Sequence, residues 1–292
     1  MTEHPEDDLA RRFEEHRGHL RAVGYRMLGS LSEADDALQE TWLRLSRTDT
    51  SDVANLGGWL TTVMARVCLN ILRSRRTRKE DPLPVHTPDP VVDRDDGVDP
   101  EHQALLADAV GLALLVVLDT LTPAERLAFV LHDMFAVPFE DIAPIVERSP
   151  TATRQLASRA RRRVQAATPR ADADLGRQRV VVDAFLAASR DGDFDALVAV
   201  LDPDVLLRAD TGRPTGLVRG AAAVAGQALM FSAMAEFRIA AIVNGSVGVV
   251  TAPGGRAASV MAFTIAGGRI VEIDILADPD RLAAMDLGGV IG

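Results

Sequence analysis

The chain has 292 residues, a formal net charge of −10 and a single cysteine. This length predicts two or three domains with sizeable cores, and one cysteine excludes an intramolecular disulfide. No apolar run approaches the ~18 residues of a membrane span and no signal-peptide pattern is present, so we expect a cytoplasmic protein with no membrane partner. The acidic total argues only weakly against nucleic-acid binding, because binding depends on local basic patches.

Helical patterns fill the first 80 residues. Apolar positions at helical spacing predict one helix over Leu9–Leu28 and a second helix that Ser32 caps and that ends at Leu45. After the polar loop Thr48–Asn55, a long helix is expected over Leu56–Lys79. This third helix is apolar at its start and basic at its end.

An acidic, proline-rich segment follows. Residues 81–108 hold eight acidic residues, five prolines and one arginine, and no helical or strand periodicity is visible before residue 101. We therefore expect residues 81–101 to form an extended linker between two helical domains.

Helical patterns return over residues 102–168. The clearest helix start follows Leu121, where Thr122 caps the helix, Pro123 suits its first turn and Glu125 completes a capping box. This stretch therefore predicts a second helical domain.

A helix-turn-helix pattern ends this second domain. An amphipathic segment, Pro138–Val146, precedes the turn Glu147–Arg148, and a second helix begins at Pro150 after the N-cap Ser149. Residues 148–163 contain six arginines and no acid, which suits contacts to phosphates and base edges. The alternative is a solvated basic helix in an ordinary bundle. The helix that begins at Pro150 is expected to carry an apolar stripe at every fourth residue, namely Ala152, Leu156, Ala160 and Val164.

The character of the sequence changes after the short linker 169–174. Helical patterns come first and strand-like runs follow, with Gly267–Gly268 as a hairpin turn signal. This order predicts an α+β domain over residues 175–292 with a curved antiparallel sheet. The expected helices are 175–189, 194–201 and 221–232, and the expected strands are 205–209, 237–244, 247–251, 259–266 and 270–276.

Residues 12–165 resemble the bacterial RNA polymerase sigma factors of the extracytoplasmic-function type, through three motifs in the order and spacing of that family. Gly24–Leu28 followed by Glu33–Leu45 resembles sigma region 2.1–2.2, Trp59–Arg76 resembles region 2.3–2.4, and Leu121–Arg163 resembles region 4. Residues from 175 onward resemble the cone-shaped SnoaL-like domain. The fusion resembles the sigma-J-like group, whose extension motifs are similar to Asn244–Gly245 and Asp278–Leu282, although the tryptophan of that group's linker motif is missing here.

The resemblance implies a multi-domain fold with two all-α sigma domains, a region 2 bundle over 1–80 and a region 4 helix-turn-helix over 102–168, and a C-terminal α+β SnoaL-like regulatory domain. It implies an alternative sigma factor that recruits core RNA polymerase to −35/−10 promoters and initiates transcription, modulated in cis by its C-terminal domain. The implied partners are core RNA polymerase, promoter DNA and an intramolecular contact between the C-terminal domain and the sigma domains. No catalytic residue, cofactor or metal is expected.

The resemblance also assigns candidate site residues. For the −10 element the candidates are Arg66, Asn70, Arg73 and Arg76, for the −35 element Arg154, Gln155, Ser158 and Arg159, and for phosphates Arg161, Arg162 and Arg163. The candidate polymerase contacts are Asp35, Asp36, Gln39, Glu40, Trp42 and Leu43. The alternatives are core packing for Trp42 and Leu43, and helix-dipole stabilisation for Asp35, Asp36 and the basic helix end. The acidic linker either threads through the polymerase or is a solubilising spacer.

Two other functions remain open from the residues alone. The first is a ligand-responsive helix-turn-helix regulator, which would have no use for the motif at residues 24–45. The second is an enzyme on the C-terminal domain, with a carboxylate as base. No histidine or tyrosine occurs after residue 132, which disfavours catalysis. The carboxylates in question are Asp210, Asp274 and Asp278, while Arg208 and Arg238 either bind an anion or pair with acids.

Overall fold

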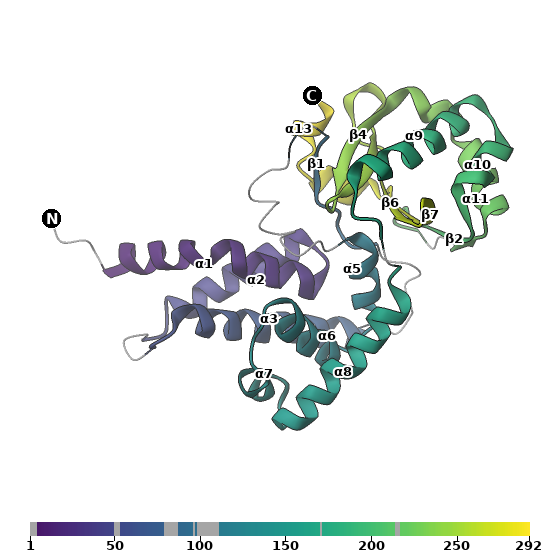
Figure 1. The fold of residues 1–292 in the computed structure, drawn as a ribbon. Coiled ribbons are helices and arrows are strands. Elements are labelled where there is room, and N and C mark those ends of the chain that lie inside the picture. Colours follow the sequence, from purple (N-terminus) through teal and green to yellow (C-terminus); the bar gives the residue numbers. More distant parts are fainter. Residues whose placement is uncertain are drawn as a thin grey trace. The chain divides into compact units, whose positions relative to one another are not determined.

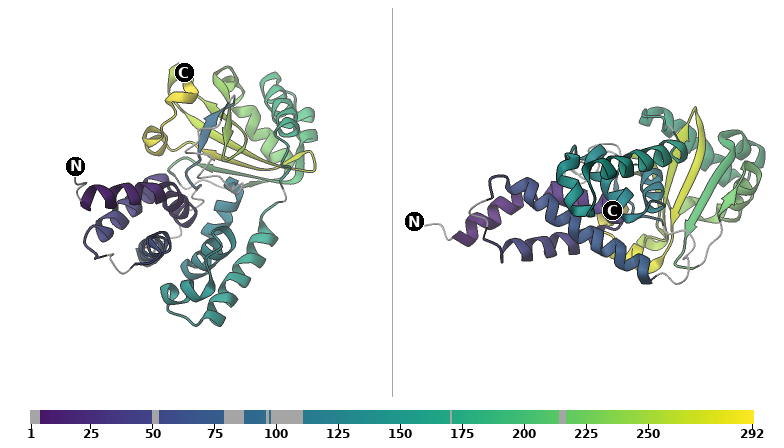
Figure 2. Two further views of the ribbon diagram at one scale, coloured as in Figure 1. Left: turned by 60° about the vertical axis from the view of Figure 1, so that its left-hand side comes forward. Right: turned by 90° about the horizontal axis from the view of Figure 1, so that it is seen from below.

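The computed structural model describes residues 5–49, 53–78, 87–95, 97, 111–169, 171–213 and 217–292. The chain divides into two compact units, shown in Figure 1 and from two further sides in Figure 2. Unit 1 comprises residues 1–81, 103–108 and 117–166, and unit 2 comprises residues 82–102, 109–116 and 167–292. The predicted helix end at Lys79 and most of the predicted linker lie outside the described residues.

Three helices form the first part of unit 1, namely α1 (Pro5–Leu28), α2 (Leu31–Leu45) and α3 (Leu56–Arg78). They pack on one another pairwise, and Gly24 permits the close approach, since a Cβ there would lie 2.4 Å from the Met64 side chain and 3.2 Å from that of Ala34. The predicted cap of the second helix was wrong by two residues. Ser30 accepts the hydrogen bond from the Glu33 amide, because Gly29 ends α1 in the left-handed region and the next residue is free to cap.

The helices of the second helical domain are α5 (Leu112–Asp119), α6 (Pro123–Phe129), the π-helical turn η1 (Val130–Met134), α7 (Phe139–Val146) and α8 (Pro150–Ala167). The capping box between Thr122 and Glu125 is confirmed, and so is the cap at Ser149, which accepts from the Ala152 amide. The turn of the helix-turn-helix places Glu147 in the left-handed region, at φ 57°.

The buried stripe of α8 differs from the predicted one. The structure buries Thr153, Ala157, Ala160 and Val164, whereas Ala152 and Leu156 are only half-buried. The observed spacing of four, three and four residues follows the 3.6-residue helical period, which a strict four-residue repeat does not. The stripe therefore starts one residue later than the sequence suggested.

Unit 2 is built on one seven-stranded sheet with the order β1-β4-β5-β6-β7-β2-β3. All neighbouring strands are antiparallel except β2 and β7, which are parallel, so the prediction of a wholly antiparallel sheet was wrong at this pair. The chain enters β2 after a helix and comes back to the sheet at β4. The successive hairpins β4-β5, β5-β6 and β6-β7 then bring β7 alongside β2 in the same direction. The strands are β1 (Val92–Arg94), β2 (Leu201–Asp210), β3 (Val218–Arg219), β4 (Arg238–Val243), β5 (Ser246–Thr251), β6 (Ser259–Ala266) and β7 (Arg269–Leu276).

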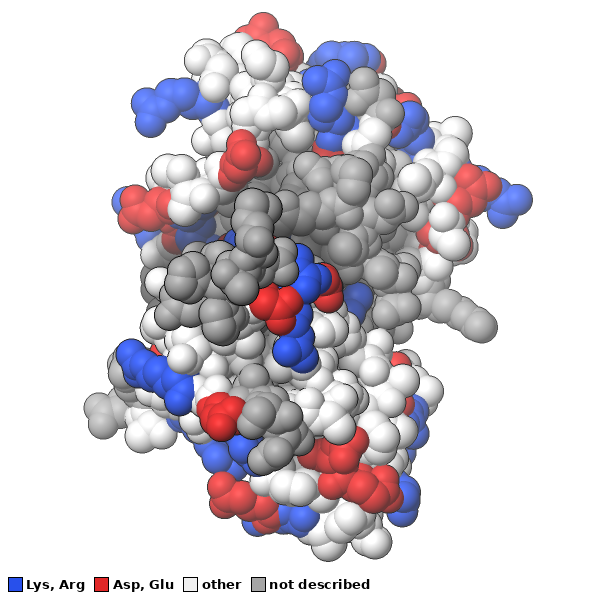
Figure 3. Space-filling model, turned by 90° about the vertical axis from the view of Figure 1, so that its left-hand side faces the viewer, with Lys and Arg blue, Asp and Glu red and all other residues white. Residues whose placement is uncertain are grey.

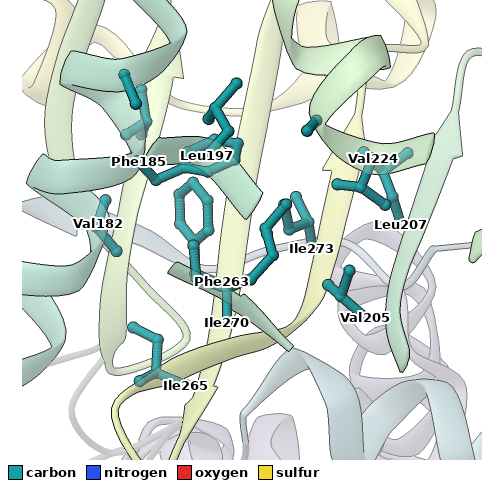
Figure 4. Packing of buried hydrophobic residues seen from close by; sticks show 14 of the residues in the cluster. Val182, Phe185, Leu197, Val205, Leu207, Val224, Phe263, Ile265, Ile270 and Ile273 are labelled. Atoms are coloured by element: carbon teal, nitrogen blue, oxygen red, sulfur yellow. The ribbon is translucent and has the colours of Figure 1, made fainter. Parts of the chain in front are cut away.

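Helices cover one face of this sheet, as Figure 1 shows for α9 (Leu175–Asp191), α10 (Phe194–Val200) and α11 (Ala221–Met230). The core lies between these helices and the sheet, with Phe263 and Phe185 in edge contact at 5.6 Å (Figure 4). The shorter elements are the 3-10 turns η2 (Ser232–Phe237) and η3 (Pro253–Gly255) and the helices α12 (Pro279–Ala284) and α13 (Gly288–Ile291).

Part of the predicted linker belongs to unit 2. Residues 92–94 form β1, which pairs with β4 at the edge of the sheet. Thr87 and Val91 just before it are 1% exposed, so this stretch is held rather than extended in solvent. Three residues are too few to show a period of two, and the sequence therefore carried no signal for this strand. No helix among the described residues is both long and apolar enough to cross a membrane.

Candidate nucleic-acid interface

The α3 candidates share one exposed stripe. Arg66, Asn70 and Arg73 follow at intervals of four and three residues, and Arg76 continues the row. All four side chains are exposed, while the opposite side of α3 supplies buried apolar residues such as Met64 to the bundle. Helical periodicity thus places three cations and one amide on a surface that a nucleic-acid backbone can reach.

The α8 candidates also lie on one side of their helix. Arg154, Gln155, Arg159 and Arg162 are exposed, and Ser158 is half-buried. Arg154 is oriented by its own domain, because its guanidinium lies 5.1 Å from the ring centroid of Phe139. Side chains near the start of the second helix are those by which a helix-turn-helix reads base edges.

A buried carboxylate holds the middle of α8. Glu125 is 5% exposed, and its carboxylate lies 3.2 Å from Arg163 and 3.5 Å from Arg159. Burial opposes ionisation of Glu125, but hydrogen bonds from Thr122 and the charges of both arginines outweigh it and lower its pKa. The capping box therefore also positions α8 against α6.

Two of the expected phosphate contacts are engaged within the protein. Arg161 donates from Nε to Asp133 at 3.1 Å, and Arg163 is bound to Glu125. Arg162 is exposed and has no such partner among the described residues. The sequence could not reveal these ion pairs, because the acids lie 28 and 38 residues away.

The α2 candidates divide into two groups. Asp35 binds Arg21 of α1 at 2.7 Å, and Glu40 binds Arg44 at 3.0 Å. Asp36 and Gln39 are exposed. The Trp42 ring packs on Phe13 of α1 with centroids 5.2 Å apart, at a groove of about 390 Å³ between the two helices.

The exposure of Leu43 distinguishes core packing from an outer contact at this position. Its exposed fraction is 38%, on the same side of α2 as Asp36 and Gln39. A single exposed apolar residue is ordinary on a protein surface, so its exposure shows that Leu43 is available for an outer contact and does not by itself mark a docking surface. Core packing therefore does not account for Leu43.

The three carboxylates considered for catalysis all have structural partners. Arg208 donates to Asp274 at 2.9 Å and to Glu272 at 2.9 Å. Burial raises the pKa of Asp274 to about 6, against the opposing effect of Arg208. Asp210 accepts from Arg281 at 2.7 Å, and Asp278 caps α12.

Glu272 was missed by the sequence reasoning. It lies two residues from Asp274 on β7, so the alternation of the strand alone places both acids on one face. Of the two roles considered for Arg208, binding an anion or pairing with acids, the structure shows the pairing with acids.

A second set of residues around the linker was also missed as a site. The Val91 amide donates to Asn244 Oδ1 at 3.0 Å, and the Thr87 amide donates to Asp210 at 3.2 Å. Arg281 Nε donates to Asp89 at 3.1 Å. The motifs Asn244–Gly245 and Asp278–Leu282 thus both reach the segment that precedes β1.

Charge alone does not mark an interface on the face drawn in Figure 3. Acidic and basic side chains of the described residues alternate there. The helix-turn-helix geometry and the exposed arginines of α3 and α8 are therefore the stronger indication of DNA binding.

The helical elements match known families. Residues 12–78 match Sigma-70 region 2, and residues 111–164 match Sigma-70, region 4. Together with the α+β domain that follows, these matches define a sigma factor that carries a C-terminal α+β domain.

Relatives cover nearly the whole chain. The probable ECF RNA polymerase sigma factor SigI of Mycobacterium tuberculosis (strain ATCC 25618 / H37Rv) is 36% identical over 99% of this chain and 100% of its own. The ECF RNA polymerase sigma factor SigJ of the same strain is 38% identical over 94% of this chain and 93% of its own. The crystal structure of M. tuberculosis SigJ aligns with a TM-score of 0.77 and 34% identity, covering 95% of this chain and 99% of that one.

The chain belongs to the extracytoplasmic-function (ECF) RNA polymerase sigma factors. It is a transcription factor and not an enzyme. As a sigma factor it binds core RNA polymerase and promoter DNA and directs the polymerase to promoters.

Proposed function

We propose that α3 reads the −10 element through Arg66, Asn70, Arg73 and Arg76, and that α8 reads the −35 element. The exposed stripe of α3 and the exposed side of α8 support this assignment. The −35 contacts are Arg154, Gln155, Ser158 and Arg159, with Arg162 on a phosphate. The side of α2 that carries Asp36, Gln39 and Leu43 docks on core polymerase, and Asp35, Glu40 and Trp42 border that surface.

This assignment corresponds to a division of the chain into residues 1–80, the linker 81–101, residues 102–168, the linker 169–174 and residues 175–292. Four of these five parts have a role in the proposed function. The first binds polymerase and the −10 element, the second spaces the readers, and the third binds the −35 element. The last part is regulatory.

We further propose that the C-terminal domain modulates transcription in cis by holding the segment between the two DNA readers. The observation that carries this proposal is the pairing of β1 with β4. Linker residues Val92–Arg94 extend the C-terminal sheet, and the side chains of Asn244 and Arg281 hold the residues just before them. A linker in this state has a shorter free length between region 2 and region 4.

The direction of control follows from the distance that the linker can span between region 2 and region 4. Between Arg78 and Leu112 a free chain spans at most about 120 Å, and every residue fixed on the sheet reduces that span. Two promoter elements must be engaged together, so release of β1 favours promoter binding. We therefore expect the held state to be the less active one.

Promoter-specific run-off transcription with core polymerase tests both parts. The full chain is compared with Asn244→Gly and Arg281→Gln, which loosen the linker, and with Arg269→Gln, an exposed residue of β7 that serves as the matched control. We expect more transcript from the first two variants and no change from the control. Equal transcript from all four would exclude linker holding as the means of control, and less transcript would reverse its direction.

A further inference from the structure

Arg238, the first residue of β4, has a guanidinium that the fold does not neutralise. Its Nη2 donates to the Ser189 hydroxyl at 3.2 Å, while its Nη1 is buried and has no hydrogen-bond partner. No carboxylate lies within ion-pair distance of Arg238 among the described residues. Burial lowers the pKa of Arg238 with no opposing effect, whereas the two carboxylates beside Arg208 raise the pKa of that arginine.

The strand register places Arg238 on the side of the sheet that faces the helices. Arg238 pairs with Thr251, and two positions further along Ala240 pairs with Val249, which belongs to the core beneath α9–α11. Residues in register share a face, so Arg238 lies at the end of the core face where the apolar filling stops. Arg238 is half-buried there, and its Nη1 is the part of the guanidinium that is removed from water without a partner.

Ser189 of α9 is committed to this arrangement. It is fully buried, and its hydroxyl donates to the carbonyl of Ala228 at 3.3 Å, so it can only accept from Arg238. The two contacts bring Ala228 and Arg238 to the same serine. The intervening residues 229–237, named the 229–237 loop, comprise the end of α11, Phe231 and the 3-10 turn η2, and the two ends of this segment meet at Ser189.

This loop carries a concentration of exposed apolar side chains. Met230 is 72% exposed, Phe231 56% and Met234 37%. Three such residues within five positions give this loop an exposed apolar surface, the apolar rim, and the loop leads directly into Arg238 at the start of β4. Glu236 lies in the same loop but is exposed and forms no ion pair with Arg238 among the described residues.

We propose that Arg238, Ser189 and the 229–237 loop form a binding site for a small organic carboxylate with an apolar body. A carboxylate accepts two parallel hydrogen bonds from a guanidinium, which would satisfy Nη1. The single cation matches a singly charged group, and the rim of Met230, Phe231 and Met234 covers the apolar body. Because Nη1 is covered, the ligand enters by displacing part of the loop. The site does not depend on how the linker is held.

Binding to the full chain tests the site. The probes are acetate, decanoate and 2-naphthoate, with decanol and naphthalene-2-methanol as uncharged matches, and the readouts are the midpoint of thermal unfolding and calorimetric titration. We expect decanoate and naphthoate to raise the midpoint and the alcohols and acetate to have no effect. In Arg238→Gln the affinity should fall at least about tenfold, or ~1.4 kcal/mol. The control Arg219→Gln, at an exposed position of β3, should bind like the unmodified chain.

Three outcomes would overturn the proposal. Equal effects of carboxylates and alcohols would indicate apolar association only. Unchanged affinity in Arg238→Gln would place the ligand elsewhere, and no carboxylate-dependent shift with any probe would mean that no such site exists. If Arg238→Gln does not fold, Arg238→Lys replaces it, because lysine keeps the charge but cannot form the two parallel bonds, so weaker binding is again expected.

Discussion

Asn244 and Val91 exchange two hydrogen bonds although 153 residues separate them. The Asn244 amide donates to the Val91 carbonyl at 2.8 Å, and the Val91 amide donates to Asn244 Oδ1 at 3.0 Å. Asn244 also forms the turn between β4 and β5, with φ at 49°. One asparagine therefore makes a hairpin turn and holds the linker, and both roles depend on its tolerance of the left-handed region.

Replacing Asn244 should release the linker strand. Asn244→Gly keeps the backbone conformation and loses only the side-chain acceptor, which should cost about 1–2 kcal/mol. Asn244→Ala adds the strain of a left-handed alanine and should cost more. The measurement is hydrogen exchange at the amides of Val92–Arg94, together with urea unfolding. Unaltered exchange in both variants would show that the strand is held by other contacts.

Arg154→Ala should weaken recognition of the −35 element by about 1–3 kcal/mol, because an oriented arginine at a base edge is lost. Fluorescence anisotropy with a labelled promoter duplex at fixed salt measures the change. Arg190→Ala removes an exposed arginine of α9 and is the control. An affinity equal to that of the control would remove Arg154 from the interface.

Leu43→Ala should weaken binding to core polymerase by about 1 kcal/mol or more. The Leu43 side chain is exposed in the free protein and would become buried at the docking surface, and alanine has less apolar area to bury. Its fold should persist, since Leu43 is 38% exposed. Competition for core polymerase measures the effect, with the exposed Val180→Ala of α9 as control. Retained affinity would locate the polymerase contact on another side of α2.

The buried Asp274 predicts a stability that rises as the pH falls. Its pKa is raised to about 6, so the folded state takes up a proton between that pH and the ordinary pKa of aspartate, while the unfolded state does not. From pH 7 to pH 4 the gain in free energy of unfolding from this group is at most ~3 kcal/mol.

Urea unfolding at several pH values compares the unmodified chain with Asp274→Asn, which removes the titrating group, and with Asp204→Asn, which changes an exposed acid. We expect the pH dependence between 7 and 4 to be reduced only in Asp274→Asn. The same slope in all three proteins would contradict the assignment.

Glu125 predicts an effect of the opposite sign. Its pKa is lowered, so its contribution is complete above the ordinary pKa of glutamate and is lost as the pH falls through the lower folded value. Glu125→Ala should destabilise unit 1 at neutral pH by about 1–2 kcal/mol, through the capping box and the ion pairs to Arg159 and Arg163. Glu125→Gln keeps the cap and should lose less. Equal losses, measured by urea unfolding, would mean that the capping hydrogen bonds of Glu125 contribute nothing, and no loss in Glu125→Gln would mean that the ion pairs contribute nothing.

Local elements were largely predictable. The capping box at Thr122 and the hairpin turn at Gly267–Gly268 are confirmed, because both depend on neighbouring residues. The errors were small or non-local. Ser30 rather than Ser32 caps α2, and β2 runs parallel to β7, which no local pattern indicates.

The sequence by itself determined the sigma regions and the exposed arginines of α3 and α8, since capping, helical period and motif spacing act over a few residues. Only the tertiary structure decided which charges are neutralised and what holds the linker. No local pattern distinguishes Arg208 from Arg238. Arg208 pairs with two carboxylates on the neighbouring strand β7, whereas Arg238 has no carboxylate partner among the described residues. Val91 likewise meets Asn244 only after the sheet forms. These outcomes depend on strand register between distant segments, and register is set by the packing of the whole domain.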